Sequence, residues 1–230
     1  ETWSPDINGV AHTLSRISYE LGQQGVLVDV IRPRPRVAAN TTGVNRELQV
    51  QRLALPGYAD VQVGLVTPAT LRRFWRQHRP DVIYLATQGP LGWAARQAAR
   101  RLNIPLVAGW HTNFDHYCED YGVNWLASST RRYLRYFHNG CALTLVPTYL
   151  QAKALQQQGI RDTHVLSRGL DGERFSPAHR DHELRQQWGV NEHQPVALYV
   201  GRLAAEKNLT LLQESFQAMR EVRPDIAQVI

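Results

Sequence analysis

The stretch Val196–Asn208 reads VALYVGRLAAEKN and joins a short apolar run to the beginning of a helical pattern. The apolar run predicts a buried strand that ends at Gly201, and the helical pattern begins near Lys207. A strand that enters a helix N-terminus through a glycine turn is where doubly wound α/β domains bind phosphate. Arg202 offers a planar fork to phosphate oxygens and Lys207 a point charge. The alternative is an ordinary turn with two solvated cations, and spacing alone slightly favours it. The predicted apolar face of the helix consists of Leu209, Leu212, Phe216 and Met219.

Upstream of this stretch, short apolar runs alternate with helical patterns, which is typical of βαβ units on a parallel sheet. We therefore predict an α/β class with a Rossmann-like parallel sheet in residues 1–192. A second Rossmann-like domain is expected to begin at residue 193, with residues 193–230 as its truncated start. The chain is expected to be a fragment that also lacks the first strand of its N-terminal domain. The segment 37–60 is expected to be irregular apart from strand-like pieces near Leu48–Val50. The predicted strands are 26–31, 81–85, 104–108, 143–146 and 163–166. The predicted helices are 10–24, 90–102, 125–138 and 148–158, and one more helix begins at Thr67 or Pro68.

The charge and the cysteine content indicate which kind of partner and which cellular setting to expect. The net charge of +6 comes from residues 1–190, and nearly all of the excess is arginine. A basic surface favours an anionic partner such as phosphate or an acidic membrane face, although a compositional bias towards arginine would give the same pattern. With two cysteines, no apolar run long enough to span a bilayer and no signal peptide, a reduced cytoplasmic setting is expected.

Two loops before the opening stretch are candidate sites. Asp6–Val10 places Gly9 at the beginning of a helix, where backbone amides can approach a ligand closely, but a plain turn explains it equally well. Gly109–Tyr117 directly follows a predicted parallel strand, and ligands of open α/β sheets bind beyond such strand ends. His111 can donate or accept a hydrogen bond there, or the loop's polar groups can simply satisfy its own backbone. A metal site is disfavoured because the spacing of His111, Asp115, His116 and Cys118 fits no structural zinc pattern.

Two helices mix arginines with aromatic residues, around Leu71–Arg76 and Trp125–Phe137. Such helices can lie on an anionic bilayer surface. We favour the more common arrangement, in which the aromatic residues enter the core and the arginines face water. Nucleic acid is not an expected partner because no binding module is recognisable.

Taken together, six stretches resemble the retaining GT-B glycosyltransferases of family 4, and in particular the bacterial GDP-mannose-dependent α-mannosyltransferases. The resemblance covers essentially the whole chain in the family's order. The stretches that carry it are Pro5–Val10, Gln88–Gly92, His111–Phe114, Val146–Thr148, Arg168–Asp171 with Phe175 and Pro177, and Gly201–Leu203 with Glu206–Asn208.

The resemblance implies roles for particular residues. Arg202 and Lys207 would bind the donor diphosphate and stabilise the leaving group without a metal or other cofactor, helped by Gly9 and Gly201. His111 would lie by the transferred sugar and count with those two cations as catalytic. Three residues would contact the acceptor, which is a glycolipid or a polar molecule at the inner face of the membrane: Asn8, Thr112 and Asn113.

The chain departs from the family pattern in two ways. It ends before the paired glutamates that hold the donor sugar and nucleoside, so we predict weak nucleotide-sugar binding and no turnover by residues 1–230. Gly169-Leu170-Asp171 replaces the commoner Gly-Val-Asp, which is conservative. Two alternatives stay open: a UDP-sugar-dependent transferase with a sugar-phosphate, sugar-nucleoside or sulfolipid acceptor, and a non-catalytic nucleotide-binding or membrane-docking module.

Overall fold

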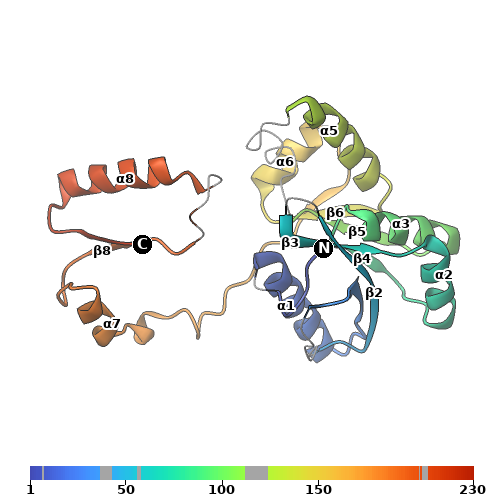
Figure 1. Ribbon diagram of the computed structural model, residues 1–230, viewed down its shortest axis with the longest axis horizontal. Helices are drawn as coiled ribbons and strands as arrows, with labels where there is room; N and C mark the ends of the chain where they lie inside the picture. The colour runs from blue at the N-terminus through green and yellow to red at the C-terminus, as the bar shows by residue number, and fades with distance from the viewer. Residues whose placement is uncertain (7, 37–42, 56–57, 112–123, 202, 204–206) are drawn as a thin grey trace. The chain divides into compact units, whose positions relative to one another are not determined.

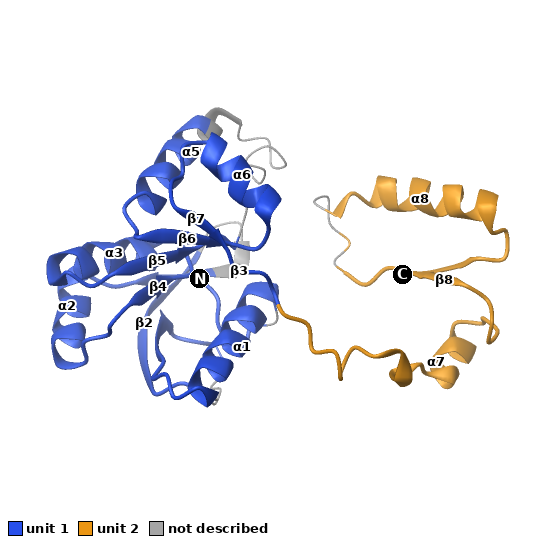
Figure 2. Cartoon of the chain, turned by 180° about the vertical axis from the view of Figure 1, so that it is seen from behind, with its two compact units in different colours: residues 1–119, 123–168 blue, residues 120–122, 169–230 orange. Residues whose placement is uncertain are grey.

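The structure is a computed structural model that describes residues 1–6, 8–36, 43–55, 58–111, 124–201, 203 and 207–230 (Figure 1). The chain divides into two compact units (Figure 2), the first reaching Arg168 and the second beginning at Gly169. The expected domain boundary at residues 192 and 193 stays a prediction.

A parallel four-stranded sheet forms the centre of the first unit. Its strands are hydrogen-bonded in chain order, with registers such as Tyr84 opposite Val107 and Val146 opposite Val165. Each of the first three strands is followed by a helix before the next strand begins, which confirms the predicted α/β class and its Rossmann-like parallel sheet. The elements are β4 (Ile83–Leu85), α3 (Pro90–Leu102), β5 (Leu106–Gly109), α5 (Asn124–His138), β6 (Leu143–Val146), α6 (Tyr149–Gln157) and β7 (Thr163–Val165).

Helix boundaries follow local capping chemistry. Helix α2 (Pro68–Gln77) begins after Thr67, whose hydroxyl accepts the Thr70 amide at 3.2 Å, and Pro68 suits the first helical turn. Helix α3 ends at Asn103, which takes a left-handed conformation with φ of 52°. These signals explain why the predicted start of α2 and both predicted boundaries of α3 are confirmed.

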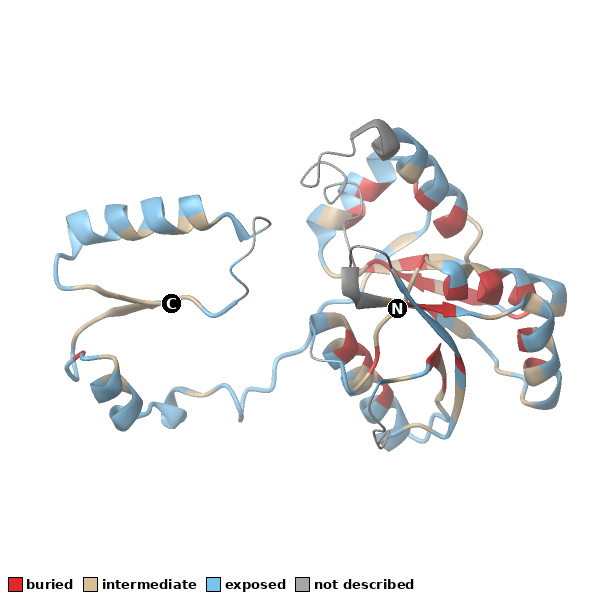
Figure 3. Cartoon of the chain, in the orientation of Figure 1, coloured by how far each residue is buried: buried red, intermediate tan, exposed pale blue. Residues whose placement is uncertain are grey.

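The core lies between these helices and the sheet, where Figure 3 shows the buried residues gathered. Leu71 and Trp75 of α2 are buried there, and Phe137 of α5 is fully enclosed. The arginines beside them, such as Arg73 and Arg131, are exposed. The arrangement that we favoured is therefore confirmed for Trp75 and Phe137, whereas Tyr133 and Tyr136 of α5 are exposed.

A second, mixed sheet corrects the expectation of an irregular segment. Strand β1 (Asp29–Pro33) pairs in parallel with β2 (Arg46–Leu55), and β2 forms an antiparallel pair with β3 (Tyr58–Leu65). The alternation of polar and apolar residues along β2 was the signal that the sequence prediction underused. Strand β1 extends through Pro33 because it lies at the edge of its sheet, where a missing amide is tolerated.

Helix α1 (Gly9–Gln23) packs near this mixed sheet through a small core of its own. Leu14 of α1 joins Trp3 and Val30 of β1 in one buried cluster. The predicted helix is confirmed, and Gly25, at φ of 82°, follows it as expected.

The second unit contains the stretch Val196–Asn208 and the helix that follows it. Strand β8 (Val196–Leu198) pairs in parallel with β9 (Ala227–Val229), and α8 (Leu209–Val222) connects them. Leu209, Leu212 and Phe216 of α8 are half-buried, whereas Met219 is exposed. The strand–helix order is confirmed, but the strand is shorter than predicted and, contrary to the prediction, none of its three residues is buried. Two short elements precede this βαβ piece, the 3₁₀ helix η1 (Pro177–His179) and α7 (His182–Gln187).

Among the described residues, no helix combines the length and the apolar character that crossing a bilayer requires.

Candidate functional site

His111 lies two residues beyond β5, at the carboxyl edge of the parallel sheet. Gly109 and Trp110 before it are buried, while His111 itself is half-buried. The Gln88 side chain donates a hydrogen bond from Nε2 to the Gly109 carbonyl at 3.1 Å, which fixes the end of the strand. The position predicted from sequence for His111 is thus the one at which parallel sheets bind ligands.

Tyr84 of the neighbouring strand β4 reaches over to His111. Its hydroxyl lies 2.9 Å from His111 Nε2, and the two rings meet edge to face with centroids 6.0 Å apart. A Cβ atom on Gly109 would lie 2.0 Å from the Tyr84 hydroxyl and 2.6 Å from His111 Nε2. Only glycine at position 109 leaves room for the two side chains to meet, so this glycine is part of the site.

The surroundings keep both groups neutral near pH 7. Burial raises the pKa of Tyr84 to about 12, against the opposing effect of the Arg168 cation. Burial lowers the pKa of His111, and the charge of Arg168 lowers it further. A neutral imidazole held by a protonated phenol can act as a hydrogen-bond partner for a sugar hydroxyl.

Arg168 connects His111 with the predicted glycine loop. It follows β7 by three residues, and its charge acts on both Tyr84 and His111. One of its terminal guanidinium nitrogens lies 4.0 Å from the place that a Cβ would occupy on Gly9. Gly9 and His111, which are 102 positions apart in the chain, therefore share Arg168 as a neighbour.

Gly9 is the first residue of α1, whose N-terminal end carries a partial positive charge. Asn8 caps this end: its side-chain oxygen accepts hydrogen bonds from the amides of Val10 at 3.1 Å and Ala11 at 2.9 Å. Two of the helix's free amides are thus occupied within the protein. An anion at this helix end would meet two positive groups, the N-terminal end of the helix dipole and the Arg168 guanidinium. Both favour a negatively charged ligand.

A buried polar network supports the strand end that carries His111. His138 Nε2 lies 3.0 Å from Gln88 Nε2, and His138 Nδ1 lies 3.0 Å from the Thr144 hydroxyl. Because an amide nitrogen can only donate, His138 Nε2 is an acceptor and its proton is on Nδ1. Burial lowers the pKa of His138 to about 4, which agrees with a neutral ring. The Tyr133 hydroxyl donates to the Gln88 backbone carbonyl and completes the network.

The remaining predicted site residues divide into two groups. Gly201 and Lys207 are exposed and belong to the second unit. Thr112, Asn113 and Arg202 lie outside the described residues, as do Asp115, His116 and Cys118 of the metal hypothesis. Within the described part of the chain, no three His, Cys, Asp or Glu residues lie close enough to hold a metal ion.

Sequence analysis missed Tyr84 and Arg168 as site residues. Arg168 stood in a stretch that carried the family resemblance, but nothing in its spacing indicated that it reaches Gly9 and His111. Tyr84 is flanked by Ile83 and Leu85 and resembled an ordinary strand residue. The glycine at position 109 was the available signal, because a glycine inside a strand often marks a close approach by another group.

Comparisons with known proteins identify the family of this chain. The model of the Glycosyltransferase Family 4 domain matches residues 7–174, and the chain belongs to this family. Among its relatives are proteins named GDP-mannose-dependent alpha-mannosyltransferase. That of Corynebacterium glutamicum is 31% identical over 92% of the chain, and that of Mycobacterium tuberculosis is 31% identical over 92%. The chain is also 29% identical, over 73% of its length, to the sulfoquinovosyl transferase SQD2 of Arabidopsis thaliana. It spans 52%, 57% and 34% of these three relatives.

Proposed function

We propose that this chain is the acceptor-side part of a retaining glycosyltransferase, joined to the beginning of its nucleotide-sugar-binding domain. The reaction would move mannose from GDP-mannose to a glycolipid or polar acceptor. The single observation that carries this proposal is the contact between the Tyr84 hydroxyl and His111 at the carboxyl edge of the parallel sheet, where the charge of Arg168 acts on both groups. Membership of Glycosyltransferase Family 4 supports the reaction class.

The chemistry of these side chains suits a nucleotide-sugar. A neutral imidazole beside a neutral phenol can bind sugar hydroxyls, while a guanidinium next to a helix N-terminus can bind a phosphate. Negative charge grows on the diphosphate as the sugar leaves, and fixed cations stabilise it. We assign this stabilisation to Arg202 and Lys207, with Arg168 as a third cation on the acceptor side. No metal or organic cofactor enters the proposed reaction.

The choice of mannose as the sugar is supported by the names of the relatives from Corynebacterium and Mycobacterium. The acceptor is proposed only as a class, a glycolipid or polar molecule at the inner face of the cytoplasmic membrane. A UDP-sugar donor with a sugar-phosphate, sugar-nucleoside or sulfolipid acceptor is the alternative. Similarity to SQD2, which is named a sulfoquinovosyl transferase, supports a transferred sugar other than mannose.

Thermal-shift measurements test the donor. We expect GDP-mannose to raise the unfolding temperature of the chain more than UDP-glucose or UDP-N-acetylglucosamine does, because a ligand stabilises the state that binds it. A shift with a UDP-sugar alone would contradict the mannosyl proposal. No shift with any of the three would contradict the proposed nucleotide-sugar site.

Two histidine variants test whether His111 takes part in the transfer reaction. His111→Ala is expected to weaken transfer in the natural-length protein, whereas His164→Ala, an exposed histidine outside the site, should leave it unchanged. Equal transfer by both variants would remove His111 from the proposed mechanism.

A further inference from the structure

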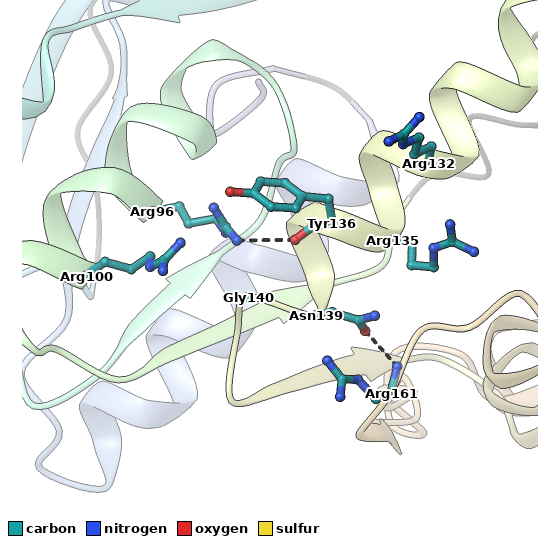
Figure 4. A pocket seen from close by; sticks show the side chains of 8 residues that line it. All are labelled: Arg96, Arg100, Arg132, Arg135, Tyr136, Asn139, Gly140 and Arg161. Carbon is teal, nitrogen blue, oxygen red and sulfur yellow. Dashed lines mark hydrogen bonds between the residues drawn. The ribbon is translucent and has the colours of Figure 1, made fainter.

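A pocket rich in arginine lies at the edge of the parallel sheet opposite to His111. His111 follows the carboxyl end of β5, whereas Gly140 precedes β6 and Arg161 precedes β7, so this pocket is at the edge where the strands begin. Its volume is about 540 Å³, which is within the range of small-molecule sites. Figure 4 shows the lining residues, which are Arg96, Arg100, Arg132, Arg135, Tyr136, Asn139, Gly140 and Arg161.

Arg96 is the innermost of these residues and is only 2% exposed. Its guanidinium donates one hydrogen bond to the Tyr136 carbonyl at 3.2 Å, but Nε and the other terminal nitrogen are buried without a partner. A Cβ on Gly140 would lie 1.8 Å from Arg96, so this glycine lets the guanidinium lie against the backbone. A buried cation with unused donors is costly unless an anion compensates it.

Three aromatic rings partly offset the free-energy cost of burying the Arg96 charge. The Tyr136 ring lies over the guanidinium at 4.7 Å, and Trp93 and Phe137 lie at 5.6 and 5.9 Å. Such contacts favour a cation but accept no hydrogen bonds from Nε in the plane of the guanidinium. They therefore explain why the charge can be buried and leave its unused donors unexplained.

The other four arginines surround Arg96 and are exposed. In the described part of the chain, none of the five arginines forms an ion pair with a carboxylate, and no Asp or Glu lines the pocket. Attraction to the C-terminal ends of α3 and α5 accounts for Arg100 and Arg135, which are in the last turns. It does not account for Arg96, Arg132 and Arg161. Five like charges around one hollow repel each other unless an anion binds between them.

We propose that this pocket binds a compact, multiply charged phosphate group, as a second anion site distinct from the nucleotide-sugar site. Guanidinium forks match phosphate oxygens in geometry, and five of them can hold two or more negative charges. The phosphate can come from a soluble diphosphate or from a phosphomonoester lipid headgroup. Both sources share the same chemistry, and the experiment below separates them.

The test compares two double variants that remove equal charge from the same helices. Arg100→Gln with Arg135→Gln changes the pocket, and Arg101→Gln with Arg131→Gln changes exposed arginines outside it. Calorimetric titration with inorganic pyrophosphate reports the soluble source. Sedimentation with phosphatidylcholine vesicles, with and without phosphatidic acid, reports the lipid source. We expect the pocket double variant to bind at least about tenfold more weakly and the control to bind like the unmodified chain.

The outcomes are separate from those that test the proposed function. Saturable pyrophosphate binding that the pocket variant loses supports a soluble ligand, and the same loss confined to phosphatidic acid vesicles supports a lipid headgroup. Lys207→Gln removes a cation of the proposed donor site and therefore measures any pyrophosphate that binds there instead of in the pocket. Failure of both probes to bind, equal losses in the two double variants, or loss through Lys207→Gln alone would each overturn the proposal.

Discussion

The Tyr84 hydroxyl and His111 Nε2 lie 2.9 Å apart, above the one strand position whose glycine leaves them room to meet. Tyr84 comes from β4 and His111 from the end of β5, so the parallel pairing of these two strands creates the contact. The contact between Tyr84 and His111 therefore requires the glycine at position 109 as well as the two side chains. This relationship gives the site its most direct mutational test.

Gly109→Ala should disrupt the pair. The added methyl group would overlap the Tyr84 hydroxyl and His111 Nε2, so one side chain must move away. We expect a loss of about 1–3 kcal/mol in the free energy of unfolding, together with loss of transfer activity in the natural-length protein. Urea unfolding and a transfer assay measure the two effects. Gly172→Ala is the matched control, because a Cβ there would meet nothing within 4 Å. Full activity in Gly109→Ala would show that the pair is dispensable.

Tyr84→Phe should separate function from stability. The ring stays, but His111 loses the hydroxyl that orients it, so we expect kcat/KM to fall about tenfold, the equivalent of about 1.4 kcal/mol. The free energy of unfolding should change by about 1 kcal/mol or less. Tyr149→Phe, at a tyrosine that is 82% exposed, should alter neither quantity. Unchanged kcat/KM in Tyr84→Phe would argue that the hydroxyl has no part in the site.

Gly9→Ala should affect stability and binding in opposite directions. The nearest atom to a Cβ at Gly9 is 4.0 Å away, so the protein itself accommodates alanine, and a helical alanine stabilises by up to about 1 kcal/mol over glycine. If a phosphate lies against Gly9, the same methyl group should weaken its binding. Thermal unfolding without ligand and titration with GDP-mannose measure the two effects. Equal affinity in both proteins would place the phosphate elsewhere.

His138 should make stability depend on pH. Its pKa is lowered by burial from 6.5 to about 4, so between these values the unfolded chain binds more protons than the folded chain. The stabilisation from the neutral ring is therefore complete above about pH 6.5 and is lost as the pH falls towards 4, by about 3 kcal/mol. We expect His138→Gln to flatten this part of the curve of unfolding free energy against pH, and His164→Gln to leave it unchanged. Parallel curves for His138→Gln and the unmodified chain would contradict this role.

Much of the fold was predictable because local signals and the hydrophobic pattern agree. Thr67 with Pro68, and Pro90, mark helix starts, and the strands β4 to β6 are short, mainly apolar runs. The mixed sheet was not predicted, although the alternation along β2 was a local signal for its hairpin with β3. The parallel pairing of β2 with β1 is a contact that hydrophobic periodicity does not report.

The candidate site was only partly predictable from sequence. His111 and Gly9 could be proposed from their places after a strand and before a helix. Tyr84 and Arg168 could not, because Tyr84 comes from the neighbouring strand β4 and Arg168 from the loop after β7, and their spacing in the chain gives no sign that they act on His111. The Arg96 pocket was equally hidden, since its arginines come from α3, α5 and the segment before β7.

The most direct measurement of the central claim is a calorimetric titration of GDP-mannose into three proteins. These are the unmodified chain, Arg168→Gln and Arg174→Gln, in which Arg174 is an exposed arginine of the same loop. We expect weak but saturable binding to the unmodified chain and to Arg174→Gln, and at least about tenfold weaker binding to Arg168→Gln, because a charge-assisted contact is lost. No binding to the unmodified chain, or equal affinity for all three proteins, would contradict the central claim.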